Sequence, residues 1–236
     1  MTALLGLDAR LRLARLVLRT DARRRQGDLA DFLTAALAGG VDLIQIHPVG
    51  LSPAAARAVL EIVHGLSSSA GAVVGVKGSA VWAGAVQVDL LQLGSSDEPT
   101  AEARQSLHPW ALLGRSTHDA AQVDAAVTDD GLDFFSVGPV SSSPGLDLVR
   151  HAARVAPAFS MAAKPWFAVG GITPDTLDGV LEAGARRVCV SSAITTADDP
   201  QEAASRLKAP LSEAWRSDPA SERYRFAAAA SPGRSR

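Results

Sequence analysis

The sequence has little cysteine, no excess of either charge sign and no long apolar run, and each shortage excludes a class of protein. One cysteine in 236 residues, Cys189, excludes an intrachain disulfide framework and a zinc site built on cysteines. No stretch approaches the roughly 18 apolar residues of a membrane span. Charged residues at Asp8, Arg10 and Arg12 interrupt the N-terminal segment, unlike a secretory signal. We therefore expect a cytoplasmic protein with no membrane partner.

The charge balance excludes a second class. The chain has 23 Lys and Arg against 25 Asp and Glu, for a formal net charge of −2, so it lacks the basic excess that phosphate-backbone binding requires, and we expect no nucleic-acid partner. With 47% hydrophobic residues it can bury a large core without disulfides or metals. Its length fits one α/β barrel of about 200–250 residues.

Short apolar runs alternate with Ala-rich amphipathic stretches, which is the pattern of repeated β-α units around a parallel sheet. The predicted strands are residues 14–18, 42–46, 72–76, 88–93, 111–113, 132–137, 166–169 and 187–190. The predicted helices are residues 28–38, 53–66, 80–84, 99–107, 119–128, 146–156, 174–183 and 200–207. No long linker divides the units, which favours a single-domain α/β fold, the (β/α)8 TIM barrel, over residues 13–210.

The remaining residues, 211–236, do not continue this pattern. They are rich in Ser, Ala, Arg and Pro and show no obvious apolar stripe, so we expect a C-terminal tail that is largely disordered.

The loops after the seventh and eighth strands predict a phosphate site. Gly170 and Gly171 follow one strand, and Ser191 and Ser192 follow the next. In barrels these two loops commonly bind phosphate through backbone N–H groups, and glycine allows close approach. The alternative is local: a tight turn at the glycines and helix capping at the serines.

Polar residues at other strand ends are further candidates. Ser116 and His118 follow the fifth strand two residues apart, so an extended segment would direct both side chains into the mouth, where His118 could transfer protons. The same segment is also a good helix cap. Gln45 ends the second strand, where a ligand or a neighbouring loop must satisfy its amide. Asp97 is a weak candidate metal ligand, since a single carboxylate makes a poor magnesium site.

These motifs together carry a resemblance. The succession TDARRRQGDLADFLTAALAGGVDLIQI, LLGRSTHD, FFSVGP, KPWFAVGGI and EAGARRVCVSSAITTADDP resembles the thiamine phosphate synthase family of TIM barrels, which includes the thiazole tautomerases. The resemblance implies a transferase that joins hydroxymethylpyrimidine diphosphate to thiazole phosphate, releasing pyrophosphate with Mg²⁺. It also implies that Gly170, Gly171, Ser191 and Ser192 hold the thiazole phosphate, that Ser116 lies near the diphosphate, that Gln45 lines the pyrimidine side and that Asp97 binds magnesium.

The sequence departs from this family on the diphosphate side. Where the family has Gln-x-Arg-x-Lys, this chain has His47 and Val49 after Gln45. The family's Asn-Asp is replaced by Lys77 and Gly78. One magnesium carboxylate and two cations are therefore missing, and Lys77 can restore one charge.

Two further departures lie nearby. The family's Thr-x-Thr-Lys loop is missing, and the shorter segment 140–144 takes its place. Gln92 replaces a histidine and Ser95 a glutamine. Each preorganised donor aimed at a leaving group contributes ~2–4 kcal/mol to transition-state stabilisation, so these losses predict a weaker synthase.

Three hypotheses follow from these departures. The first is a divergent but active synthase in which Lys77, Arg115 and the loop of Arg23, Arg24 and Arg25 replace the missing cations. The second is a thiazole tautomerase-like enzyme that uses His118. The third is a non-catalytic relative, a pseudoenzyme of thiamine biosynthesis that binds thiazole phosphate or thiamine phosphate. Erosion of the diphosphate side favours weak or lost synthase activity. We expect a small phosphate ligand in each case, Mg²⁺ only if synthase activity is retained, and a possible homo-oligomer.

Overall fold

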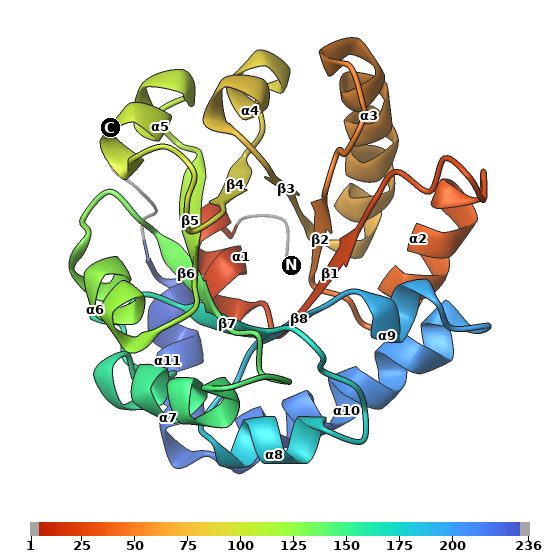
Figure 1. The fold of residues 1–236 in the computed structure, drawn as a ribbon. Helices are drawn as coiled ribbons and strands as arrows, with labels where there is room; N and C mark the ends of the chain where they lie inside the picture. Colours follow the sequence, from red (N-terminus) through yellow and green to blue (C-terminus); the bar gives the residue numbers. More distant parts are fainter. Residues whose placement is uncertain (1–4, 232–236) are drawn as a thin grey trace.

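The computed structural model describes residues 5–231, and within them the sheet closes into a parallel barrel in the order β1 to β8. Figure 1 looks along the barrel axis, with the helices forming an outer ring. The strands are β1 (Leu16–Thr20), β2 (Leu43–Ile46), β3 (Val73–Lys77), β4 (Leu90–Leu93), β5 (Leu112–Thr117), β6 (Phe134–Val137), β7 (Trp166–Val169) and β8 (Val188–Val190). The predicted (β/α)8 barrel is confirmed, with each strand within a few residues of its expected place.

The helices are α1 (Leu7–Leu13), α2 (Leu29–Ala38), α3 (Pro53–Ala70), α4 (Ala80–Val86), α5 (Thr100–Ser106), α6 (Ala120–Thr128), α7 (Gly145–Val155), α8 (Leu177–Glu182), α9 (Ser192–Thr195), α10 (Pro200–Ser217) and α11 (Pro219–Ala229). The predicted helices are present in the expected order, and α1, α9 and α11 are additional to them. Among the described helices, none is both long enough and apolar enough to cross a bilayer.

Local signals explain where several helices begin and end. The side chain of Asp199 accepts from the Glu202 N–H at 2.9 Å at the start of α10, and Pro200 occupies the first helical position. Asp119 caps α6 in the same way. The long helix α3 ends at Gly71, whose φ of +68° lies in the left-handed region. These polar and glycine caps satisfy backbone groups that a helix end leaves unpaired.

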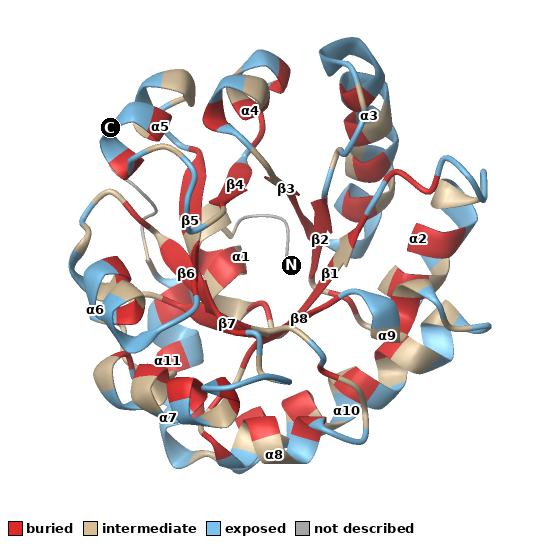
Figure 2. Cartoon of the chain, viewed as in Figure 1, coloured by how far each residue is buried: buried red, intermediate tan, exposed pale blue. Residues whose placement is uncertain are grey.

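The barrel has two apolar layers. The larger lies between the sheet and the surrounding helices, and Figure 2 shows the buried residues on the strands and on the helix faces turned toward them. The smaller fills the barrel interior with the alternate side chain of each strand, and Leu11 of α1 closes its base: Val17, Leu43, Val73, Leu90, Leu112, Phe134, Phe167, Cys189 and Leu11. Cys189 is therefore part of the packing, and burial raises the pKa of its thiol.

The C-terminal segment corrects the sequence prediction. A disordered tail from residue 211 is wrong for the described part, because α10 continues to Ser217 and α11 follows. Pro210 inside α10 looks like a boundary and removes one helical bond, at a cost of about 3 kcal/mol. Burial of Leu211 and Trp215 offsets that cost, since each contributes roughly 2–3 kcal/mol. Residues 232–236 lie outside the described residues.

A buried arginine joins α11 to the barrel. Arg187 is 1% exposed and donates to the Tyr224 hydroxyl of α11 at 2.9 Å and to the Arg12 carbonyl at 2.8 Å. Trp215, Tyr224 and Phe159 pack edge to face around it. Burial lowers the pKa of Arg187, and the neutral acceptors satisfy its guanidinium. This packing explains why α11 is ordered against the barrel.

Candidate active site at the carboxyl end of the barrel

A polar layer lies above the interior apolar layer, at the carboxyl ends of the strands. Because side chains alternate along a strand, the inward positions above Val17 and Leu43 are Arg19 and Gln45. On β3 the position paired with Gln45 is Gly75, where a Cβ would lie 2.5 Å from the Leu90 side chain. The next inward residue of β3 is Lys77. The inward polar residues are Arg19, Gln45, Lys77, Gln92, Ser116 and Ser136.

Hydrogen bonds join this layer across the barrel. The Arg19 Nε donates to the Gln45 Oε1 at 2.6 Å. The Gln45 Nε2 donates to the Gln92 Oε1 at 3.2 Å, and the Gln92 Nε2 reaches the hydroxyls of Ser116 and Ser136. Side chains of β1 and β4 therefore satisfy the Gln45 amide, and Gln45 helps to orient Arg19.

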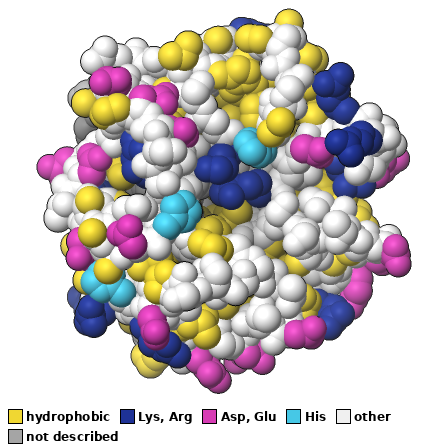
Figure 3. Space-filling model, viewed as in Figure 1, with side chains coloured by type: hydrophobic (Ala, Val, Ile, Leu, Met, Phe, Trp, Pro, Cys, Tyr) yellow, Lys and Arg dark blue, Asp and Glu magenta, His cyan; other side chains and the backbone are white. Residues whose placement is uncertain are grey.

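Lys77 is the second cation of the mouth. Its Nζ donates to the Ser116 Oγ at 3.3 Å. Burial, and then the charge of Arg19, lower the pKa of Lys77, while Asp97 acts in the opposite direction. Partial burial of its ring and the two cations likewise lower the pKa of His47 at the rim. Figure 3 shows Lys and Arg side chains gathered beside a His near the middle of this face. The mouth is therefore positively charged.

The predicted phosphate residues form one cavity. Gly170, Gly171, Ser191 and Ser192 line a space of about 150 Å³ between β7 and β8, together with Arg19. A water occupies about 30 Å³ in the liquid, so the cavity is large enough for a phosphate group. Within residues 5–231 the N–H groups of Gly171 and Ser192 donate to no protein acceptor. Free N–H groups beside an arginine suit an anion.

Local packing also explains why glycine occupies positions 170 and 171. Their φ values are +90° and +75°, for Gly170 and Gly171. A Cβ on Gly170 would lie 2.6 Å from the Pro139 Cβ, and one on Gly171 would lie 2.4 Å from the Ser141 Cβ. The loop after β6 thus packs tightly against the loop after β7, and only glycine fits at this junction.

The structure separates Ser116 from His118. Ser116 is 6% exposed and belongs to the polar layer. His118 follows the end of β5, its side chain is exposed at the rim, and its Nδ1 bonds to the Gly138 carbonyl. Thr117 turns away from the mouth to the Ser136 carbonyl at 2.9 Å. The expected alternation therefore ends with the strand, so His118 lies outside the polar layer.

The carboxylates on this face do not form a magnesium site. Asp97 is exposed, and its Oδ2 accepts the Gly94 N–H at 2.5 Å. Glu98 accepts from the Ala80 N–H at 2.6 Å. In the described part of the chain no group of three His, Cys, Asp or Glu residues could hold a metal ion. With Lys77 and Gly78 where the resemblance implies Asn-Asp, a carboxylate is missing and a cation is added, so the residues present do not fit a protein-held Mg²⁺.

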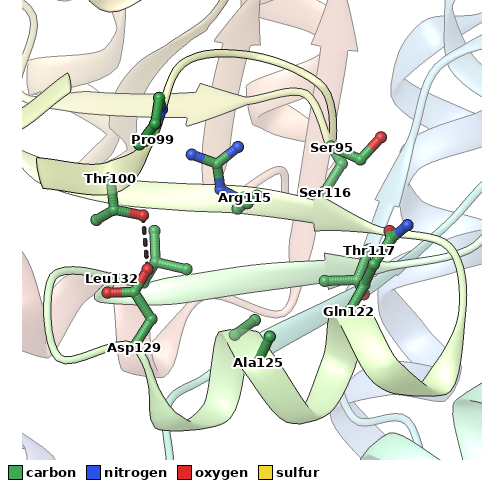
Figure 4. Close-up of a pocket in the computed structure, with 11 residues that line it drawn as sticks. Ser95, Pro99, Thr100, Arg115, Ser116, Thr117, Gln122, Ala125, Asp129 and Leu132 are labelled. Carbon is green, nitrogen blue, oxygen red and sulfur yellow. Dashed lines mark hydrogen bonds between the residues drawn. The ribbon is translucent and has the colours of Figure 1, made fainter. Parts of the chain in front are cut away.

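Arg115 and Arg23, which the sequence suggested as replacements for the missing diphosphate-side cations, do not lie in the polar layer. Arg115 occupies an outward position of β5 and donates to the carbonyls of Gly94 and Glu98. Figure 4 shows it in a separate cavity between α5 and α6, where Thr100 bonds to Asp129. Arg23 is bound to Asp28 at 2.6 Å. Of the expected replacements, Lys77 reaches the polar layer.

Sequence reasoning missed Arg19. The signal was a single arginine between the apolar residues 16–18 and Thr20. A strand that is buried on both faces does not reveal which alternate positions point inward, so this arginine could not be assigned to the mouth before the barrel closed.

The closed barrel, its polar mouth and the cavity between β7 and β8 define a (β/α)8 protein with the architecture common to phosphate-binding barrels. A model of the family described as thiamine monophosphate synthase matches residues 16–194. The chain belongs to this family, whose members act in thiamine biosynthesis.

Individual relatives agree with this assignment. A thiamine-phosphate synthase of Streptomyces avermitilis is 47% identical over 203 residues, covering 83% of this chain and 92% of the relative. One of Mycobacterium marinum is 48% identical over 220 residues, covering 86% and 97%. A thiamine phosphate pyrophosphorylase structure from Pyrococcus furiosus has a TM-score of 0.74 at 24% identity, covering 87% of this chain and 98% of that one, and supports the fold.

Proposed function

We propose that this protein is a thiamine-phosphate synthase, joining hydroxymethylpyrimidine diphosphate to thiazole phosphate with release of pyrophosphate. Relatives with 47–48% identity that carry this name support the activity. The observation that carries the proposal is the cavity in which Arg19 lies beside Gly171 and Ser192. The expectation of weak or lost synthase activity depended on the cations missing from the diphosphate side. Arg19 supplies a cation at the mouth that this expectation did not include. The relatives therefore favour the active-synthase alternative over the eroded one.

The proposed roles follow from position. In the reaction the thiazole nitrogen forms a bond to the pyrimidine methylene carbon as the carbon–oxygen bond to diphosphate breaks, and the electron pair leaves with the diphosphate. Gly171 and Ser192 would hold the thiazole phosphate through backbone N–H groups. Gln45 and Ser116 would line the pyrimidine side. Arg19 and Lys77 would stabilise the charge that develops on the leaving group.

A binding protein without catalysis is the second candidate. The segment after β6 is short: α7 begins at Gly145, directly after residues 140–144, and in the family this segment carries a Thr-x-Thr-Lys loop. A shorter loop covers less of the mouth, and shielding from water favours diphosphate departure. Such a protein would bind thiazole phosphate or thiamine phosphate and release no pyrophosphate.

A thiazole tautomerase is the third candidate. The bond between the His118 Nδ1 and the Gly138 carbonyl orients the ring, and an oriented imidazole can transfer a proton through its second nitrogen. This candidate requires thiazole phosphate isomerisation that is lost in His118→Asn.

Titration calorimetry with thiazole phosphate and a pyrophosphate-release assay with both substrates, each with and without Mg²⁺, test the proposal. We expect pyrophosphate release at about 1–10 s⁻¹, in the lower part of the range of ordinary enzymes. Lys77→Met should reduce it strongly. The matched control is Arg206→Gln, which removes an exposed cation of α10, away from the mouth. Tight thiazole phosphate binding with no pyrophosphate release under any condition would overturn the synthase and leave the binding protein or the tautomerase.

A further inference from the structure

The mouth contains two cations without a counter-ion. Elsewhere in the described chain, Lys208 and Arg104 are paired with the carboxylates of Asp42 and Asp133. Cations without a carboxylate partner, such as Arg187 and Lys164, each donate to several carbonyl groups. Among the described residues no Asp or Glu lies within ion-pair distance of Arg19 or Lys77. Their protein partners are a neutral amide and a neutral hydroxyl.

This arrangement is unfavourable in the empty protein. A partly buried charge loses hydration, and for Lys77 the distant carboxylate of Asp97 restores only part of that loss. Arg19 and Lys77 also repel each other, which contributes to the lowered pKa of Lys77. His47 adds a third positive group when it is protonated. An anion seated among these groups would remove the penalty.

The geometry of Arg19 shows where such an anion would bind. Its Nε is used by Gln45, while its Nη2 is buried and has no hydrogen-bond partner. Arg19 borders the cavity that Gly171 and Ser192 form, which Lys77 does not line. An anion between Arg19 and Lys77 would therefore lie beside the cavity proposed for the thiazole phosphate, not inside it. A fixed guanidinium with a free N–H group is a ready donor for a phosphate oxygen.

The same region is unfavourable for a divalent metal. Asp97 is engaged by the Gly94 N–H, and the carboxylates described on this face do not form a metal-binding group. A divalent cation beside Lys77 would meet like charge where a carboxylate ligand is needed.

We propose that Arg19 and Lys77 form an anion subsite that binds the diphosphate-type group of a ligand directly, in place of a divalent metal ion. The identity of the natural ligand rests on the proposed function, whereas the subsite itself requires no turnover. Because both cations contact one ligand, the subsite prefers pyrophosphate to inorganic phosphate. Since Mg²⁺ cancels part of the negative charge of pyrophosphate in solution, the metal weakens binding to this subsite.

Titration calorimetry of the full chain with pyrophosphate in EDTA tests this proposal. We expect pyrophosphate to bind in EDTA at least tenfold more tightly than inorganic phosphate. Adding Mg²⁺ in excess of pyrophosphate should reduce the affinity. Arg19→Gln and Lys77→Gln should each weaken binding roughly 10- to 100-fold, as loss of a charge-assisted bond does. Lys77→Arg should retain most of the pyrophosphate affinity, and the exposed control Arg206→Gln should leave that affinity unchanged.

Several outcomes would overturn the subsite. Pyrophosphate binding that requires Mg²⁺, or that Lys77→Gln and Arg19→Gln leave intact, excludes it. Thermal unfolding of each variant separates loss of binding from loss of fold, and Lys77→Arg provides a second folded variant. Binding in EDTA without pyrophosphate release from the substrates keeps the subsite and excludes the synthase. Turnover that requires Mg²⁺ and is unaffected by Lys77→Gln keeps the synthase and excludes the subsite.

Discussion

The Arg19 Nε donates to the Gln45 Oε1 at 2.6 Å, and this bond holds the arginine so that its Nη2 is buried without a partner. Gln45 is in turn held by Gln92. Gln45 is therefore a positioning residue for the Arg19 cation. This structural role is additional to the pyrimidine contact that the family resemblance implies for its amide.

Replacing Gln45 with glutamate tests this role. The substitution preserves size and places a carboxylate where Gln45 Oε1 now accepts from Arg19. The new ion pair neutralises the guanidinium, so we expect pyrophosphate to bind at least tenfold more weakly in EDTA. Gln45→Met removes the amide and adds no charge, and it should cause a smaller loss. Equal effects of the two variants on affinity would contradict a charge-based role.

Gly171→Ala should destabilise the fold and impair phosphate binding together. The φ of +75° and the 2.4 Å approach to the Ser141 Cβ both oppose a side chain, and backbone strain of this kind costs about 1–3 kcal/mol. Urea unfolding and titration with thiazole phosphate measure the two effects. Gly65→Ala is the control, since Gly65 lies in α3 with open space at its Cβ. It should stabilise the helix by about 0.5–1 kcal/mol.

Lys77→Met should increase stability while removing anion binding. Because burial and Arg19 lower the folded-state pKa of Lys77 below its unfolded value, the cost of charging it is fully present below the folded pKa. That cost disappears as the pH rises from the folded toward the unfolded pKa. We expect the variant to be more stable by about 1 kcal/mol at neutral pH. The difference should shrink at alkaline pH.

The groups that set the pKa of Lys77 come from several elements: Arg19 on β1, Asp97 after β4 and Cys189 on β8. Urea unfolding of parent and variant across a pH series measures the difference. Lys208→Met is the contrasting variant: it removes the partner of Asp42 and should destabilise the protein. A less stable Lys77→Met would mean that the cation is compensated within the fold.

Tyr224→Phe tests whether α11 is part of the folded domain. Loss of the hydroxyl removes one acceptor from the buried Arg187, and hydrogen bonds to charged groups contribute about 1.5–3 kcal/mol. We expect the free energy of unfolding to fall by an amount near the lower end of this range, because the carbonyls of Arg12 and Ala158 still accept from Arg187. Phe226→Ala should change stability by less than about 0.5 kcal/mol, since Phe226 is 72% exposed. Equal stabilities of Tyr224→Phe and the parent would mean that α11 contributes little.

The sequence by itself determined the barrel and the place of its loops. Each β-α unit has its own local pattern, with caps such as Asp199 and glycine ends such as Gly71. These patterns depend only on residues close in the sequence, so the order of the β-α units could be predicted. In a barrel the loops after consecutive strands lie side by side, so the sequence also predicted that Gly170, Gly171, Ser191 and Ser192 come together.

Tertiary structure alone decided which cations face the mouth and whether the C-terminal segment is ordered. Arg19 and Arg115 look equivalent in the sequence, yet β1 turns one inward and β5 turns the other outward. Strands buried on both faces carry no marker of that direction, so barrel closure fixes it. Likewise, Tyr224 is buried because it packs against Arg187, which is distant in the sequence and donates a hydrogen bond to its hydroxyl. Such long-range contacts leave no local periodic pattern in the chain.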